Sequence, residues 1–130
     1  MQLRTTVFLG PYGVGTFHIF TTDLAEGMKG CDAVFIAVGT PARRGDGHAD
    51  LSFVHAVARE IGESLSNEAV VVTKSTVPVG TGDEVERILS ESAAVQERGL
   101  KVAVVSNPEF LREGAAIDDF KRPDRIVIGA

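Results

Sequence analysis

The sequence predicts an α/β fold built on a parallel, doubly wound sheet, and three observations support this. Short apolar runs rich in β-branched residues occur several times along the chain. Segments with apolar residues at helical spacing lie between these runs. The resulting order is strand, helix, strand, helix, strand, for which a parallel sheet with crossover helices on both faces is the economical solution. The length of 130 residues predicts one domain.

Composition excludes several classes of function. A net charge of −5 with no basic block leaves nothing to neutralise nucleic-acid phosphates. No apolar run reaches the roughly 18 residues of a membrane span, and no leader pattern is present, so we expect a cytoplasmic protein without a membrane partner. Cys31 is the single cysteine, which leaves neither an internal disulfide nor a thiolate cluster. His18, His48 and His55 share no ligand spacing, so no metal site is predicted.

Residues 1–17 form an atypical lead-in. Gly10, Gly13 and Gly15 have the spacing G-x-x-G-x-G, which differs from the dinucleotide pattern G-x-G-x-x-G, and no amphipathic helix follows them. We interpret the segment as flexible, with a degenerate phosphate loop as the alternative. The regular domain is expected over residues 18–130.

The first regular elements follow from Thr22 onward. Asp23 and Glu26 have the spacing of a capping box for a short helix that ends at Gly30. Residues 32–38 are continuously apolar and predict a strand that is buried on both faces. Residues 42–49 are polar and glycine-rich, which indicates a surface loop.

The second half of the chain repeats the alternation. Asp50 is expected to cap a helix with one apolar stripe: Leu51, Val54, Val57, Ala58, Ile61 and Leu65. Residues 69–73 predict a second buried strand. Thr81 and Glu84 have capping-box spacing for a helix that runs to about residue 98 and ends at Gly99. Further strands are expected at 102–105 and 125–129, with a short helix at 115–120 between them.

Three polar motifs each begin where a predicted strand ends: residues 39–41, 75–81 and 106–114. In open parallel sheets the loops that follow successive strands converge at one edge, and ligands bind there. Ser75 and Thr76 precede a predicted helix start that favours an anion, although such hydroxyls also satisfy backbone groups in ordinary loops. For Lys74 the sequence leaves phosphate pairing and simple solvation open.

The third motif contains two glutamates. Asn107 suits a helix N-cap, Pro108 the first helical position and Gly114 the stop. A helix between them places Glu109 and Glu113 on one face, where both carboxylates reach one bound molecule. The alternative is a solvated acidic turn.

Five ordered segments carry a resemblance to a known family: TTDLAE, VFIAVGTP, DGHADLSFV, VVVTKSTVPVGTGDEV and VVSNPEFLREGAAIDDFKRPDRIVIGA. Together these segments resemble the UDP-glucose/GDP-mannose dehydrogenase family, and the resemblance covers about residues 19–130. The resemblance implies a Rossmann-like fold, here the second half of a dinucleotide-binding domain. It also implies an NAD-dependent enzyme that oxidises the C6 alcohol of a nucleotide sugar in two hydride transfers through a cysteine thioester, with UDP-glucose as the favoured substrate.

The resemblance assigns roles position by position. It implies cofactor-binding residues at Val38, Gly39, Thr40, Pro41, Ser75, Thr76 and Glu113. It implies substrate-binding residues at Glu109, Phe110, Leu111, Arg112 and Glu113. It implies catalytic residues at Thr76, Glu109 and Glu113, with Thr76 and Glu113 holding the water that hydrolyses the thioester and Glu109 lying beside the sugar. A hydroxyl and a carboxylate are suitable groups to orient such a water.

The chain also departs from the family pattern. The family's G-x-G-Y-V-G loop is not present, and its nucleophilic cysteine and further catalytic residues belong to regions beyond residue 130. We therefore expect a fragment that is inactive alone. The alternatives are a fragment of a GDP-mannose or other nucleotide-sugar dehydrogenase, or a non-catalytic nucleotide-binding remnant. The resemblance implies a homodimeric parent enzyme and leaves the oligomeric state of this chain open.

Overall fold

The computed structural model describes residues 6–9, 18–45 and 47–129. Its strands are β1 (Thr6–Leu9), β2 (His18–Thr21), β3 (Ala33–Ile36), β4 (Ala69–Thr73) and β5 (Val102–Ser106). Its helices are α1 (Leu24–Met28), α2 (Ser52–Ser64), α3 (Thr81–Ser90), α4 (Ala93–Arg98) and α5 (Ala116–Lys121). The predicted alternation of strands and helices is confirmed from residue 23 to residue 106.

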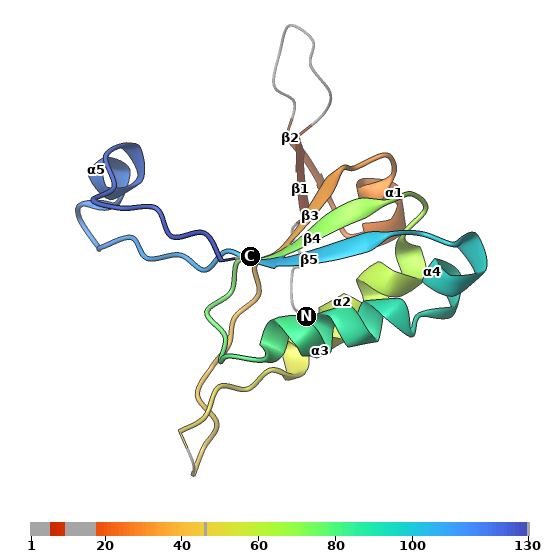
Figure 1. Cartoon of the computed structure of the whole chain (residues 1–130), viewed down its shortest axis with the longest axis horizontal. Helices are drawn as coiled ribbons and strands as arrows, with labels where there is room; N and C mark the ends of the chain where they lie inside the picture. Colours follow the sequence, from red (N-terminus) through yellow and green to blue (C-terminus); the bar gives the residue numbers. More distant parts are fainter. Residues whose placement is uncertain (1–5, 10–17, 46, 130) are drawn as a thin grey trace, which may run out of the picture.

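A three-stranded parallel sheet in the order β3-β4-β5 forms the centre of the fold. Consecutive strands are neighbours, so each crossover, through α2 and then through α3 and α4, advances by one strand. Figure 1 shows these three helices together on one side of the sheet. The predicted α/β class with a parallel sheet is therefore confirmed.

The core lies between the sheet and α2 and α3. The apolar stripe of α2 faces it as predicted, with Val54, Ala58 and Ile61 almost fully buried. Val85 and Leu89 of α3 pack against the same cluster. Burial of each such side chain contributes about 1.5–3 kcal/mol. This packing holds the crossover helices under the strands and fixes where the strands end.

The opposite face of the sheet is not covered by the described residues. Phe35 is 61% exposed, and Val70 and Val105 are partly exposed on the same sheet. The expectation that the strand at 32–38 is buried on both faces, with helices on each side of the sheet, is therefore wrong for the described chain, whereas the central strand β4 is buried except at Val70. Strand β3 alternates between exposed and buried residues, as a half-buried strand does.

The N-terminal lead-in contains a strand that the sequence analysis did not predict. Residues 6–9 pair antiparallel with residues 18–21, Thr6 opposite Thr21 and Leu9 opposite His18. Strand pairing replaces the expected flexible segment at residues 6–9, and the apolar run at 7–9 is its sequence signal. Gly10, Gly13 and Gly15, which were considered for a phosphate loop, lie outside the described residues.

Helix ends follow the predictions in part. The Asp23 side chain accepts the Glu26 amide at 3.0 Å as the N-cap of α1, but the Asp23 amide donates to the Thr21 hydroxyl at 3.0 Å, so the reciprocal bond of the predicted capping box is absent. Asp50 accepts the Ser52 amide at 3.0 Å, although Leu51 is the N-cap residue of α2. Gly99 ends α4 with φ of 61° in the left-handed region, as predicted for a terminal glycine.

The second capping box is absent. Gly80 is the N-cap of α3, with φ of 88°, and the Thr81 hydroxyl donates to the Pro78 carbonyl at 2.8 Å. Glu84 pairs with Arg87 at 2.7 Å instead of returning to the helix start. The single predicted helix over 81–98 is also divided, because Ser92 has extended backbone angles and begins α4.

The fourth predicted strand does not form. Residues 125–129 have no strand partner among the described residues, and Ile126, Val127 and Ile128 are exposed. Their apolar run therefore predicted β-structure that the described chain does not realise. A strand needs a neighbour for its backbone groups, and the described residues provide none at this point.

Asn67 is a structural residue that the sequence analysis overlooked. Its side chain accepts the Gly30 amide at 3.1 Å and donates to the carbonyls of Cys31 and Glu68 at 2.9 Å each. It thereby ties the segment before β3 to the segment before β4.

We expect Asn67→Ala to lower the free energy of unfolding by about 1 kcal/mol, since these groups lose their partner near the surface. Asn67→Asp keeps the acceptor but sets a carboxylate oxygen against two carbonyls, so it is expected to destabilise at least as much. Urea denaturation followed by circular dichroism measures both variants. Wild-type stability for both variants would show that solvent replaces these bonds at no cost.

Candidate functional site at the carboxyl edge of the sheet

The ends of the three parallel strands place three turns side by side. Ile36 is in register with Thr73, and Thr73 with Ser106. The polar motifs that follow these residues therefore start at one edge of the sheet. This confirms the predicted convergence of the motifs at 39–41, 75–81 and 106–114.

Side chains and backbone groups connect each turn to the next. The Thr40 hydroxyl donates to the Thr76 carbonyl at 3.0 Å, which joins the first turn to the second. The Lys74 ammonium donates to the Asn107 side-chain oxygen at 3.0 Å, and the Asn107 amide donates to the Thr73 carbonyl at 2.9 Å. Lys74, whose role the sequence left open, thus links the second turn to the third.

The first two turns retain hydrogen-bonding groups for a ligand. Within the described residues, the Thr76 hydroxyl and the amides of Gly39 and Thr40 have no partner. Gly39 borders open space, because a Cβ added there would meet no atom within 4 Å. Thr76 and Pro41 are exposed, and Val38 is half-buried below them. These donors fit an oxygen-rich cofactor such as a dinucleotide.

The start of α3 is a weaker site for an anion than the sequence predicts. The N-cap residue Gly80 has no side chain, so no capping side chain accepts a hydrogen bond from the amides in the first turn of α3. However, Asp83 and Glu84 occupy that turn and already supply negative charge to the helix dipole. An anionic group would meet their carboxylates there. The structure therefore supports the turns, more than the helix start, as the place of contact.

The predicted helix from Pro108 to Gly114 is wrong. Residues 107–112 are extended coil and 113–115 a turn, and Asn107 bonds Lys74 in place of capping a helix. Glu109 accepts the Leu111 amide locally, and both Glu109 and Glu113 are exposed. The shared helical face that would have joined the two carboxylates does not exist.

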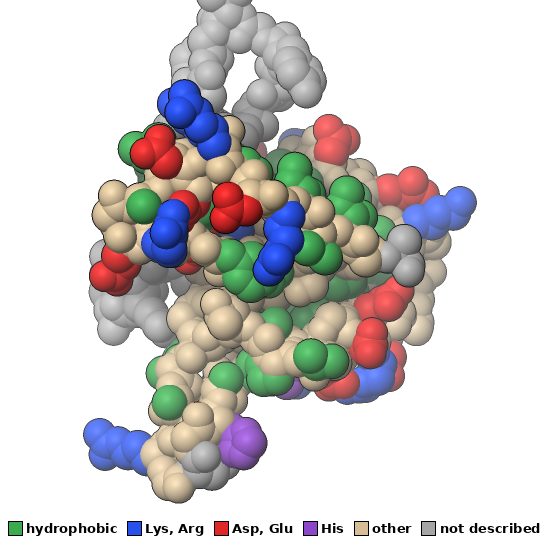
Figure 2. Space-filling model, turned by 60° about the vertical axis from the view of Figure 1, so that its left-hand side comes forward, with side chains coloured by type: hydrophobic (Ala, Val, Ile, Leu, Met, Phe, Trp, Pro, Cys, Tyr) green, Lys and Arg blue, Asp and Glu red, His purple; other side chains and the backbone are tan. Residues whose placement is uncertain are grey.

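The segment after β5 runs away from the edge of the sheet, carries α5 at its far end and then returns (Figure 1). No hydrogen bond or ion pair within the described part of the chain joins residues 109–113 to the first two turns. Thr76 is therefore not brought together with Glu109 and Glu113. Figure 2, in which this segment comes forward, shows hydrophobic and charged side chains beside one another; the exposed apolar ones include Phe110, Ile117 and Phe120.

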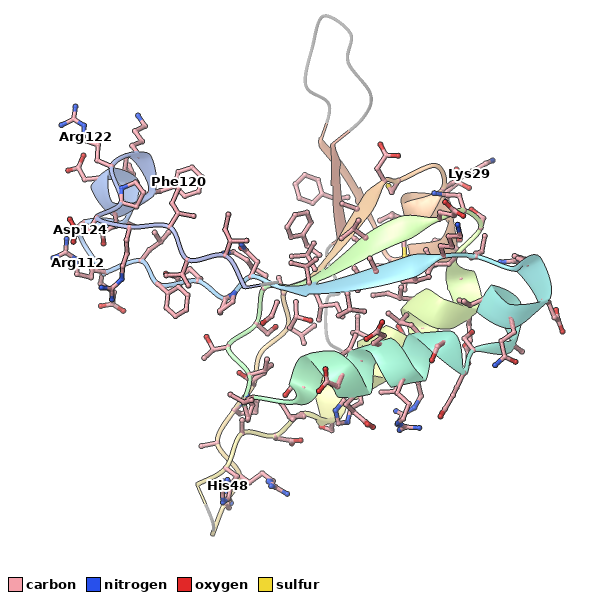
Figure 3. The ribbon with its side chains drawn as sticks, viewed as in Figure 1. Lys29, His48, Arg112, Phe120, Arg122 and Asp124 are labelled. Carbon is pink, nitrogen blue, oxygen red and sulfur yellow. The ribbon has the colours of Figure 1, made fainter. Side chains whose placement is uncertain are left out.

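Arg112 has a partner within its own segment. Its guanidinium donates to both carboxylate oxygens of Asp119, at 2.6 and 3.1 Å, and its amide donates to the same group at 3.0 Å. Figure 3 shows Arg112 at the outer end of the molecule, beside α5. The side-chain hydrogen bonds from Arg112 lower the pKa of Asp119 to about 2 and raise the pKa of Arg112.

This pair predicts a specific pH response. The Asp119 pKa falls from 3.8 in the unfolded chain to about 2 in the folded chain. The depressed pKa means that the pairing is fully present above about pH 4 and is lost as the pH falls toward 2. The carboxyl carbon shift of Asp119, followed by NMR, should have its midpoint near 2. Arg112→Gln should return that midpoint toward 3.8, and an unchanged midpoint would show that the arginine is not the cause.

The described residues contain no group of three His, Cys, Asp or Glu side chains placed to hold a metal ion. No described helix is long and apolar enough to cross a membrane. Cys31 lies at the opposite edge of the sheet, ahead of β3, where its thiol donates to the Gly27 carbonyl at 3.5 Å. Burial and, to a lesser degree, Asp32 raise the pKa of this thiol.

Two contacts in this region were not predicted from the sequence, which left the role of Lys74 open and gave no role to Asp119. Lys74 binds Asn107, which is 33 residues away in the chain. Asp119 binds Arg112, which is 7 residues away. No spacing rule connects Lys74 to Asn107, although both lie directly after adjacent strands. That position is the one signal that could have identified the pair.

Comparisons with known proteins agree with this architecture. The model of the UDP-glucose/GDP-mannose dehydrogenase family, NAD binding domain, matches residues 14–130. UDP-glucose 6-dehydrogenase of Rhizobium meliloti is 69% identical over 110 residues, which are 85% of this chain and 24% of that protein. UDP-glucose 6-dehydrogenase of Pseudomonas aeruginosa is 55% identical over 111 residues, with the same coverage.

Solved structures show the same relationship. A UDP-glucose dehydrogenase from the hyperthermophilic archaeon Pyrobaculum islandicum superposes with a TM-score of 0.70 at 49% identity, over 84% of this chain and 25% of that one. A ternary complex of GDP-mannose dehydrogenase from Pseudomonas aeruginosa gives 0.64 at 38% identity, over 79% and 24%. The chain thus spans about a quarter of the length of these relatives. It belongs to the UDP-glucose/GDP-mannose dehydrogenase family, of which it represents the Rossmann-like NAD binding domain.

Proposed function

We propose that this chain is the NAD-binding part of a nucleotide-sugar dehydrogenase whose substrate is UDP-glucose. The observation that supports it most directly is the pair of turns after β3 and β4. They present the Gly39 and Thr40 amides and the Thr76 hydroxyl, unpartnered among the described residues, at the edge where parallel sheets bind ligands. The family model describes an NAD binding domain over these same residues.

The chemistry is divided between the cofactor and the chain. Bound NAD would supply a hydride acceptor for each oxidation of the C6 alcohol. Residues 38–41 and 75–76 would bind the cofactor. Thr76 and Glu113 would hold the water for thioester hydrolysis, Glu109 would lie beside the sugar, and residues 110–112 would contact the nucleotide sugar. All three of these tasks need the segment after β5 close to the first two turns, and the first of them needs Glu113 beside Thr76.

Two observations bear on the substrate. The UDP-glucose 6-dehydrogenases of Rhizobium meliloti and Pseudomonas aeruginosa are 69% and 55% identical, whereas the GDP-mannose dehydrogenase structure is 38% identical to the chain. This difference favours UDP-glucose as the substrate.

We also place the parent enzyme in the cytoplasm, where NAD and the nucleotide sugar are available. The family resemblance favours a homodimer.

A non-catalytic nucleotide-binding module is the second candidate. It is favoured by one feature: no contact within the described residues brings Glu109 or Glu113 to Thr76. This candidate shares NAD binding with the first and differs in having no place in the oxidation.

Titration of the isolated chain with NAD, followed by ligand-observed NMR, tests the binding. We expect weak, saturable binding that Thr76→Val reduces by about threefold to tenfold, since one hydrogen bond is lost. Ser90→Ala is the control, because its hydroxyl donates to the Arg87 carbonyl on the exposed side of α3. Equal affinity for NAD in Thr76→Val would remove this residue from the cofactor site.

An NADH-formation assay with UDP-glucose tests the activity. The isolated chain should show no turnover above blank, because the residues described here contain no cysteine at this edge of the sheet. Turnover would contradict the prediction that the chain is inactive alone. Titration with UDP-glucose and, separately, GDP-mannose then distinguishes the two nucleotide sugars and the non-catalytic module, which should bind neither.

A further inference from the structure

Ser75 makes an unusual set of contacts for a residue expected to touch the cofactor. It lies directly after β4 and is only 8% exposed. Its hydroxyl oxygen accepts the Val38 amide at 2.9 Å and lies 2.7 Å from the Val38 carbonyl. Both polar backbone groups of Val38, 37 residues away in the chain, are thus bonded by one side chain.

The hydroxyl has no donor left for a ligand. A serine carries one O–H proton, and the Val38 carbonyl at 2.7 Å is a better acceptor than the Ile36 carbonyl at 3.4 Å. The Ser75 amide also donates to Ile36, at 3.2 Å. Ser75 therefore faces into the structure, in contrast to the neighbouring Thr76, whose side chain is exposed.

Packing gives little support to the turn that Ser75 holds, and the far end of that turn is fixed by the Asp50 amide, which donates to the Pro41 carbonyl at 2.8 Å. Gly39 borders open space, and Pro41 is exposed, so packing does not determine the path of residues 39–41. A further hydrogen bond between the first and second turns runs from the Thr40 hydroxyl to the Thr76 carbonyl at 3.0 Å. Two hydroxyls, one from each turn, thus bond the backbone of the opposite turn.

We propose that Ser75 is a positioning residue, not a cofactor ligand, and that the Ser75 and Thr40 hydroxyls form a reciprocal clamp that presents the Gly39 and Thr40 amides to the cofactor. This rests on the proposed NAD binding and refines it, since it removes Ser75 from the residues that touch the cofactor. Preorganised donors bind a ligand without the entropic cost of ordering a loop. The clamp makes the first turn such a preorganised element.

Amide hydrogen exchange measured by NMR tests the clamp in the absence of any ligand. Ser75→Ala should speed exchange of the Val38 amide by at least about tenfold, because its acceptor is removed. Val71, which lies in the centre of β4 and is fully buried, reports on the rest of the sheet and should be unaffected. Thr40→Val, a change at a partly exposed position that leaves Ser75 intact, should shift the Gly39 and Thr40 amide signals and keep Val38 protected.

Titration of the same variants with NAD tests the consequence. We expect Ser75→Ala to weaken NAD binding by about fivefold to tenfold and Thr40→Val by about threefold, and Ser90→Ala to leave it unchanged.

The Ser75→Ala results decide the role of Ser75. Faster Val38 exchange together with weaker NAD binding supports positioning. For Ser75→Ala, weaker binding with Val38 still protected would overturn it, since Ser75 would then be a direct ligand, and so would faster Val38 exchange with unchanged affinity. Absence of NAD binding in the wild-type chain would refute the proposed function, while the exchange data would still decide the clamp. If Ser75→Ala fails to fold, Thr40→Val decides by the Gly39 and Thr40 amide signals and the NAD affinity, and unchanged signals with unchanged affinity would overturn the clamp.

Discussion

Leu89→Ala is expected to lower the free energy of unfolding by about 2–5 kcal/mol, the usual range for truncating a fully buried leucine. Leu89 is 1% exposed and lies on the face of α3 that packs against α2 and the sheet. A domain of this size has a total stability of roughly 5–15 kcal/mol, so the loss is a large fraction of it. The melting temperature should fall by at least about 8 °C.

Ile117→Ala is the matched control for this prediction. It removes an aliphatic side chain from a helical position in α5 that is 71% exposed, and it should change stability by no more than about 0.5 kcal/mol. Urea denaturation of both variants by circular dichroism measures the difference. Comparable small effects for the two variants would mean that α3 is not part of the cooperative core.

The sequence predicted the framework well because hydrophobic patterning alone decides it. The runs at 69–73 and 102–105 and the stripe that includes Val54, Ala58 and Ile61 appear in the structure where they were expected. Once the parallel strands are located, the residues at which they end are known. The position of the three polar motifs at one edge of the sheet was therefore also predictable. Neither inference needs knowledge of contacts between distant side chains.

Local signals failed where a distant partner competes with them. Asn107 has the chemistry of a helix cap, but Lys74 takes its side-chain oxygen, and the helix predicted after it is absent. Thr81 has the spacing of a capping box, but its hydroxyl bonds the Pro78 carbonyl. A short polar side chain can hydrogen-bond several backbone or side-chain groups. The fold decides which of these groups is near, and the neighbouring sequence does not show it.

The convergence of the three motifs at one edge was predictable, but the direction in which each side chain points there was not. Resemblance assigned Ser75 and Thr76 together to the cofactor, yet the structure separates them, with one buried under Val38 and the other exposed. The sequence does not show which of two adjacent polar residues turns into the structure, and here the chain bends at Ser75, directly after β4. The apolar residues Phe35 and Val70 likewise predicted burial on a face that the described residues leave open.

Two helical glycines should respond in opposite directions to the same substitution. A Cβ added at Gly62 in α2 would lie 2.8 Å from the Cβ of Ser92, closer than real Cβ atoms approach, whereas a Cβ at Gly82 in α3 would meet nothing within 4 Å. Gly82→Ala should therefore stabilise by up to about 1 kcal/mol through helix propensity. Gly62→Ala should destabilise by about 1–3 kcal/mol, because α2 and the start of α4 must separate.

A double-mutant cycle with Ser92→Gly identifies the cause. Ser92 is the N-cap of α4 but makes no capping hydrogen bond with its side chain, so Ser92→Gly alone should cost only a few tenths of a kcal/mol. It removes both atoms that crowd Gly62, the Cβ at 2.8 Å and the Oγ at 3.1 Å. In that background Gly62→Ala should become stabilising, as at Gly82, since only helix propensity remains. Urea denaturation of the four proteins gives the coupling energy, and a Gly62→Ala effect that is the same in both backgrounds would show that the contact between α2 and Ser92 does not limit the packing of these helices.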